Sequence, residues 1–130
     1  MAENHTAVVF NKAVQNGAIN FDAHNGAGDG SVVARIAAAG YSQNGLPFYR
    51  PENWSMYWTT GQLSTAAQQQ AAIEAMHAGL FYDDPAKNTG EGGGHRLAML
   101  DPNMKEMGAA VQFGQFQGNN TCLLYTSRCV

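Results

Sequence analysis

The sequence has few charged residues, and it has no excess of basic ones. Only 13% of its 130 residues are charged, and the formal net charge is −3. Domains that bind nucleic acid usually carry a basic face, so a nucleic-acid partner is not expected. No apolar run is long enough to span a bilayer, so no transmembrane segment is expected either. Residues 1–5 also lack the pattern of a signal peptide.

Cysteine is absent from the chain until its final segment, residues 122–130, which contains Cys122 and Cys129. This segment does not continue the pattern before it. Its codons can spell a sequencing-library adapter joined to its own reverse complement, with a stop codon next. We therefore predict that residues 122–130 are an adapter-derived tail, and the cysteines then say nothing about disulfides. The alternative is a genuine short tail.

The remaining residues, 1–121, have the composition and length of one globular domain, with 45% hydrophobic residues over the whole chain. Local signals predict helices over 6–15 and from 32, the second capped by Ser31, and a longer helix over 66–78 that starts with the capping box of Thr65 and Gln68. Alternating apolar residues predict strands over 52–59 and 107–116. We expect helices on both sides of antiparallel strands, an α/β layered (α+β) domain.

One stretch stands out as a site for chemistry. His95 follows a glycine-rich lead-in at residues 90–94 and precedes a one-turn apolar segment, then Asp101, Pro102 and a strand entered through Gly108. Glycines allow close backbone approach, so this context favours the display of one side chain at the rim of a cleft. His24 and Glu52 are its candidate partners upstream.

Four segments carry one family resemblance: residues 21–41, with His24 and Arg35; 51–54; 76–81; and 94–111. Together they resemble the bacterial branch of the CAP superfamily. This superfamily includes cysteine-rich secretory proteins, insect venom allergens and plant pathogenesis-related proteins. The resemblance covers residues 7–116, and it depends on the order and spacing of the segments rather than on any single one. One motif departs from the family, because Pro51 replaces the glycine of its Gly-Glu-Asn sequence.

The resemblance implies an α-β-α sandwich, incomplete at both ends, with a cleft lined by two histidines and acidic residues. In the family these histidines can bind a divalent metal, commonly zinc. The implied ligands here are His24 and His95, with Glu52 as the first acid of the cleft. Glu74 is the nearest candidate for the second acid but does not match its position cleanly, and His77 is the alternative.

The resulting hypothesis is a secreted, bacterial-type CAP domain, present as a fragment that starts at an internal methionine. Its cleft would bind a divalent metal and an extracellular small molecule, lipid, glycan or peptide. The alternatives are a metal-dependent, peptidase-like hydrolase with Glu52 as general base, and a protein-interaction module with a vestigial cleft. Binding is favoured over catalysis, because the chain lacks the His-Glu-x-x-His motif and any recognisable nucleophile motif.

Purely structural roles compete with these assignments. His95 can cap its short helix, His24 can be a solvated loop residue, and Glu52 can hold a loop through backbone amides. His77 lies on an apolar stripe and can be a core histidine, with Glu74 a solvated helix charge. Arg35 can bind neighbouring acids or extend over apolar surface, and we expect Asp29 to serve as a turn or cap residue.

Overall fold

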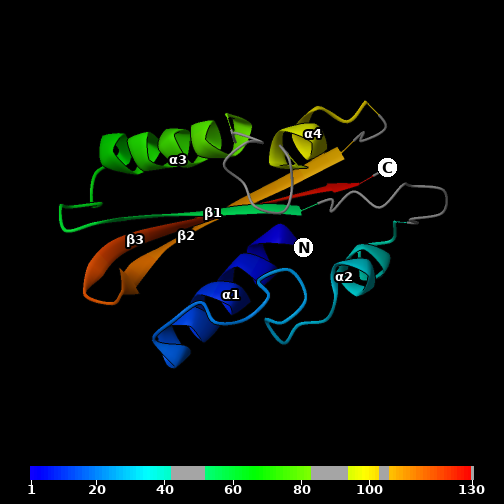
Figure 1. Cartoon of the computed structure of the whole chain (residues 1–130), viewed down its shortest axis with the longest axis horizontal. Helices are drawn as coiled ribbons and strands as arrows, with labels where there is room; N and C mark the ends of the chain where they lie inside the picture. The colour runs from blue at the N-terminus through cyan, green and yellow to red at the C-terminus, as the bar shows by residue number, and fades with distance from the viewer. Residues whose placement is uncertain (42–51, 83–93, 103–105, 130) are drawn as a thin grey trace.

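In the computed structural model, helices cover both faces of a small antiparallel sheet. The structure describes residues 1–41, 52–82, 94–102 and 106–129. Helices α3 and α4 lie on one side of the sheet, and α1 and α2 lie on the other (Figure 1). This arrangement confirms the expected α/β class and its layered order. The glycine-rich lead-in at 90–93 and the Pro51 substitution lie outside the described residues.

The helices lie where local signals predict them, but α1 starts earlier than expected and α3 continues to Phe81, beyond its predicted end at residue 78. Helix α1 (Ala2–Asn16) starts before the expected residue 6 and ends at Gly17, whose φ of 64° is left-handed. Helix α2 (Val32–Ala38) is capped by Ser31, which accepts a hydrogen bond from the amide of Ala34. Helix α3 (Ala66–Phe81) starts with both bonds of the predicted capping box, and α4 spans Gly94–Leu100. Thus the capping signals located the starts of α2 and α3 correctly.

The sheet has three strands in the order β1-β3-β2, all antiparallel. Strand β1 (Glu52–Thr59) has the predicted bounds, and β2 (Glu106–Phe116) starts one residue before its prediction. Strand β3 (Asn119–Cys129) pairs with both neighbours and is central. It follows β2 through a two-residue turn at Gln117 and Gly118, both at positive φ, as in a type I′ hairpin turn.

The structure places the predicted tail within the fold rather than beyond it. Residues 122–129 form most of the central strand, and Cys122 and Tyr125 are fully buried. The apolar run from Cys122 to Tyr125 satisfies the pattern of a buried strand, which is why it packs well there. The domain boundary at residue 121 is therefore not a boundary of the fold. The adapter origin of the segment stays a prediction, since it concerns the nucleotide sequence.

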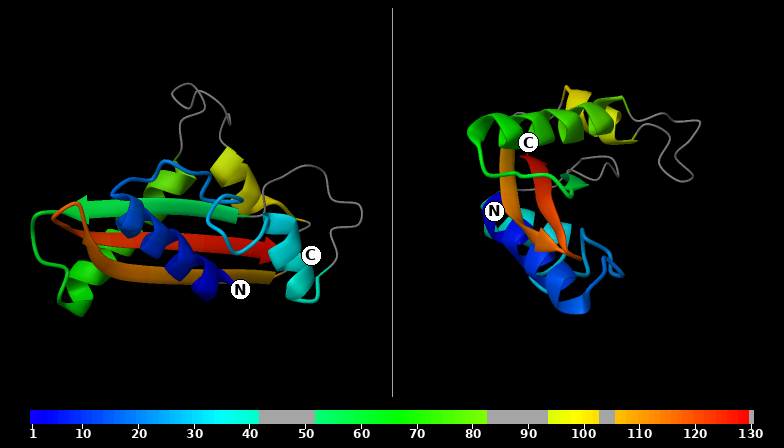
Figure 2. Two further views of the ribbon diagram at one scale, coloured as in Figure 1. Left: turned by 90° about the horizontal axis from the view of Figure 1, so that it is seen from below. Right: turned by 90° about the vertical axis from the view of Figure 1, so that its left-hand side faces the viewer.

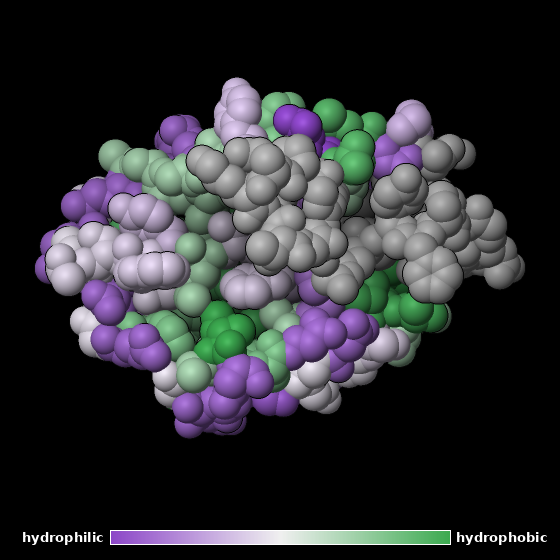
Figure 3. Space-filling model, in the orientation of Figure 1, coloured by the Kyte–Doolittle hydropathy of each residue, from purple (hydrophilic) through white to green (hydrophobic). Residues whose placement is uncertain are grey.

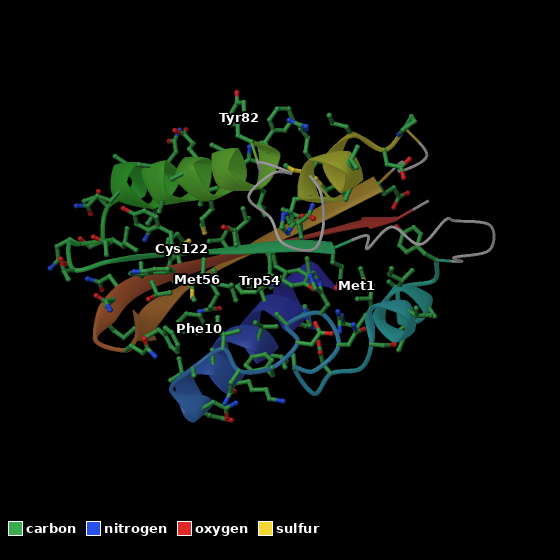
Figure 4. All side chains as sticks on the ribbon, in the orientation of Figure 1. Met1, Phe10, Trp54, Met56, Tyr82 and Cys122 are labelled. Carbon is green, nitrogen blue, oxygen red and sulfur yellow. The ribbon has the colours of Figure 1, made fainter. Side chains whose placement is uncertain are left out.

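The core is divided into two layers by the sheet. On the α1 face, Val9, Phe10 and Leu123 form one cluster, and Trp54 and Met56 pack against it. Figure 4 shows the last two side chains on the side of β1 that faces Phe10. On the α3 face, the second cluster contains Ala72, Met76, Leu80, Cys122 and Leu124. Alternation along β1 and β3 thus decides which side chains meet α1 and which meet α3.

Helix α1 runs diagonally across its face of the sheet (Figure 2, left), and α2 lies near one end of the strands. That end is where β1 begins, at Glu52. The loop between α1 and α2 carries His24. The fold thus brings this loop close to the first residue of β1.

Candidate functional site

The loop that carries His24 is held by short-range hydrogen bonds. Asp22 accepts from the His24 amide at 2.8 Å and from the Asn25 side chain at 3.1 Å. The Asn25 bond is the largest of several hydrogen bonds that lower the pKa of Asp22. The Gly26 amide donates to the carbonyl oxygen of Asp22 at 2.6 Å, and a Cβ at Gly26 would lie 2.8 Å from that oxygen. Glycine is therefore needed for this turn, and His24 is only 6% exposed.

Glu52 lies directly against this loop at the start of β1, with 2% exposure. Its Oε2 accepts a hydrogen bond from Arg35 Nη2 at 2.7 Å and another from the Tyr125 hydroxyl, and it lies 3.6 Å from His24 Nδ1. Burial alone would raise the pKa of Glu52, but its contacts with His24, Tyr125 and Arg35 lower it overall. Glu52 is therefore a buried, ionised carboxylate.

The hydrogen bonds around Tyr125 determine the proton position on His24. An ionised Glu52 can only accept, so the Tyr125 hydroxyl donates to it. The pKa of Tyr125 is raised by burial and by Glu52, so the phenol keeps its proton. Its oxygen then accepts from His24 Nδ1 at 3.2 Å. This places a proton on Nδ1 and leaves the lone pair of a neutral His24 on Nε2.

Arg35 connects the loop to Glu52. Its Nη2 also donates to the carbonyl oxygen of His24 at 2.7 Å, and its Nη1 donates to the carbonyl oxygen of Gly30 at 2.6 Å and to Asp29 Oδ1 at 3.3 Å. Of the two roles expected for Arg35, pairing with neighbouring acids is the one observed, because the side chain is 7% exposed and paired with two carboxylates; extension over apolar surface is wrong. Two buried atoms, Arg35 Nε and Glu52 Oε1, have no hydrogen-bond partner among the described residues.

His5 is a member of this cluster that sequence reasoning missed. It lies on α1 with 1% exposure, and its Nδ1 is 2.7 Å from Asp29 Oδ2. Its Nε2 donates to the carbonyl oxygen of Ala23 at 2.8 Å. Asp29 is thus an ion-pair partner rather than only a turn residue. A signal existed, since His5, Val9 and Ala13 share one helical face once α1 is extended to residue 2.

The other candidate residues lie on the opposite face of the sheet. His77 and Glu74 are exposed on α3 and line a cavity of about 430 Å³. His77 stacks on Phe81, with ring centroids 6.5 Å apart. The alternative in which His77 is a core histidine is wrong, because its side chain is exposed. Glu52 contacts Tyr125, whereas His77 lines the cavity with Leu124 and Thr126 on the other face of the sheet, so among the described residues one cleft does not contain both. Glu74 accepts a hydrogen bond from Gln70 at 2.7 Å.

His95 lies in the first turn of α4 and is half-buried. Helix α4 contacts α3 and β1. Within residues 1–41, 52–82, 94–102 and 106–129, no three His, Cys, Asp or Glu residues form a group that could hold a metal ion. Zinc binding by His24 and His95 therefore stays a prediction.

The comparison with protein families decides the classification. The model of the CAP family, described as the Cysteine-rich secretory protein family, matches residues 10–126. The chain belongs to the CAP family. No curated protein and no solved structure gave a match. The CAP match includes residues 122–126 of the central strand, as well as His24, Glu52, His77 and His95.

The CAP domain has no membrane-spanning helix in the part of the chain that the structure describes. None of the described helices combines the length and apolar composition needed to cross a bilayer.

Proposed function

We propose that this CAP domain is secreted and that it binds a small, largely apolar extracellular molecule in the cavity between α3, α4 and the sheet. The observation that carries the proposal is the cavity itself. Its volume of about 430 Å³ lies in the range typical of small-molecule sites, and its lining is mostly apolar. The lining residues are Ile73, Glu74, His77, Met99, Met107, Ala109, Leu124 and Thr126.

The lining favours a lipid-like molecule over a glycan. Met99 and Met107 are flexible and polarisable, so they can adapt to an irregular apolar ligand. A glycan would need many hydrogen-bonding groups, whereas His77 and Glu74 are the main polar side chains here. A single hydroxyl or amine at the end of an apolar chain matches that pair. In the face that Figure 3 shows, hydrophobic residues also reach the surface over α4, where Leu97 and Leu100 are exposed.

Glu52 is poorly suited to the alternative role of general base. A general base must accept a proton from the substrate, and Glu52 Oε2 already accepts hydrogen bonds from Arg35 and Tyr125, so only the buried Oε1 is left for this role. The lowered pKa of Glu52 also weakens it as a base. These contacts support binding rather than hydrolysis.

Filling the cavity should weaken binding. We expect Ala109→Trp to weaken the binding of a fluorescent fatty acid, such as cis-parinaric acid, by at least about tenfold, since Ala109 is exposed and lines the cavity. Ala75→Trp is the matched control, because Ala75 is exposed on α3 outside the lining. Titration of the probe into wild type and both variants gives the dissociation constants. Equal binding by all three proteins would place the site elsewhere.

Zinc binding is a second candidate, favoured by two atoms near the His24 loop. The Nε2 lone pair of His24 and the unpartnered Oε1 of Glu52 are a possible nitrogen and oxygen donor. Arg35 opposes this role, because its positive charge lies 2.7 Å from the other oxygen of Glu52. With His95 as a further ligand, bound zinc would act there as a Lewis acid.

Calorimetric titration with zinc chloride tests that candidate. We expect His24→Ala and His95→Ala each to weaken zinc binding by at least about tenfold. His77→Ala is the control and should bind zinc as wild type does, because His77 lies on α3, across the sheet from Glu52. If the His24 and His95 variants also bind like wild type, the assigned ligand set is incorrect. If neither zinc nor the fatty acid binds, the protein-interaction module becomes the better hypothesis.

A further inference from the structure

Both ring nitrogens of His5 face oxygen acceptors. Nδ1 is 2.7 Å from a carboxylate oxygen of Asp29, and Nε2 is 2.8 Å from the carbonyl oxygen of Ala23. A neutral imidazole has one N–H group and one lone pair, so it can donate to only one of these oxygens. The other contact would then place a lone pair against an acceptor. Either His5 carries two protons, or Asp29 carries one.

The charges around His5 favour the doubly protonated ring. Asp29 Oδ1 also accepts a hydrogen bond from Arg35 Nη1 at 3.3 Å. A guanidinium beside a carboxylate favours the ionised form of the carboxylate. Among the other nearby groups, the Tyr125 ring contacts His5 edge-on, with ring centroids 4.4 Å apart. Glu52 and the His24 carbonyl oxygen are linked to His5 only indirectly, through Arg35 and Asp29. Two carboxylates, Asp29 and Glu52, then balance two cations, Arg35 and His5.

We propose that His5 is a doubly protonated positioning residue, which connects α1 to the loop on both sides of His24. Its Nε2–H holds Ala23, the residue before His24, and its Nδ1–H holds Asp29. Asp29 in turn binds Arg35, which binds the carbonyl oxygen of His24 and the carboxylate of Glu52. His5 therefore acts on His24 through backbone and ion-pair contacts, without touching a ligand.

This inference is independent of the proposed cavity on the α3 face, so the two can fail separately. It is also independent of the origin of residues 122–130, because the contacts with Ala23, Asp29 and Arg35 lie within residues 1–41. Lys12 adds a further tie from α1 to the same loop, through a 2.5 Å bond to the carbonyl oxygen of Gly26. The loop is thus held at three points by one helix.

Nitrogen-15 NMR of the histidine rings in the intact chain tests the protonation state. We expect two ring N–H groups on His5 near neutral pH, and exposed His77 serves as a reference in the same spectrum. Asp29→Asn should reduce the two groups to one, because the introduced carboxamide can donate to a neutral Nδ1 while Nε2–H keeps its bond to Ala23. One N–H group on His5 in the wild-type protein would overturn the proposal. Unchanged double protonation in Asp29→Asn would also contradict it.

Hydrogen exchange tests the positioning role. His5→Gln can replace only one of the two donors, so the amides of His24, Gly26 and Val32 should exchange about tenfold faster. His77→Gln is the matched control and should leave them unchanged. Equal exchange in both variants would refute the role, and a His5→Gln protein that fails to fold leaves the NMR test decisive.

Discussion

Arg35→Met is expected to lower the free energy of unfolding by about 3–5 kcal/mol, because it leaves Glu52 buried without its cation. Arg35 and Glu52 are 7% and 2% exposed, so water cannot replace the lost partner. The same change removes the donors to the carbonyl oxygens of His24 and Gly30. Methionine keeps much of the side-chain volume, so the loss reports charge and hydrogen bonds more than packing. Urea-induced unfolding followed by circular dichroism measures the change.

Two further variants distinguish the loss of the Arg35–Glu52 ion pair from nonspecific destabilisation by the substitution. Arg96→Met is the matched control on α4, where the arginine is only half-buried, and it should stay within about 0.5 kcal/mol of wild type. The double variant Arg35→Met/Glu52→Met should lose less stability than the sum of the single losses, because no unpaired charge remains. Additive losses, or equal effects of the two arginine variants, would show that the pair does not act as described.

The pH dependence of stability follows from the same contacts. The pKa of Glu52 is lowered from 4.5 in the folded protein. Its contribution to stability is therefore complete above pH 4.5 and is lost as the pH falls through the folded-state value. In Arg35→Met the carboxyl group loses the cation that helps to keep it ionised, so the destabilisation should shrink as the pH falls.

Local signals are sufficient to predict most of the helices and strands. The side chains of Ser31 and Thr65 accept hydrogen bonds from unpaired amide groups at the helix starts, and Gln68 completes the capping box. Donor and acceptor lie within four residues of each other, so the sequence alone is enough to predict these starts. The alternation at 52–59 likewise locates β1 with correct bounds. Sheet order is not readable in this way. The match between its codons and an adapter sequence leads to the prediction that most of the central strand, β3, is a tail. Its apolar run nevertheless fits a buried strand.

The site is predictable only where the family resemblance supplies long-range information. The resemblance points to His24 and Glu52, which the structure brings within 3.6 Å. It does not supply His5, whose partners Ala23 and Asp29 lie 18 and 24 residues away. Nor does it distinguish the two faces of the sheet, which separate Glu52 from His77. Such assignments depend on the face of the assembled sheet to which each side chain points. The spacing of residues along the chain does not determine that face.

The contact between Phe10 and Gly114 offers a second large effect, on the α1 face. Phe10 is 7% exposed within the core cluster, and truncation to alanine should lower the free energy of unfolding by about 3–5 kcal/mol. Gly114 of β2 lies against its ring, and a Cβ built there would be 2.6 Å from Phe10 Cζ. Gly114→Ala alone should therefore cost about 1–3 kcal/mol through overpacking, since the buried ring has little room to move.

Combining the two changes should reverse the sign of the Gly114 effect. In a Phe10→Ala background the added methyl group fills part of the cavity, so Gly114→Ala should restore stability instead of reducing it. Gly79→Ala is the control, because nothing lies within 4 Å of its added Cβ and the helical position favours alanine. Urea unfolding of the four proteins in the cycle measures the coupling. A destabilising Gly114→Ala in both backgrounds would mean that Phe10 is not what the methyl group meets, and that α1 does not cross the sheet in this register.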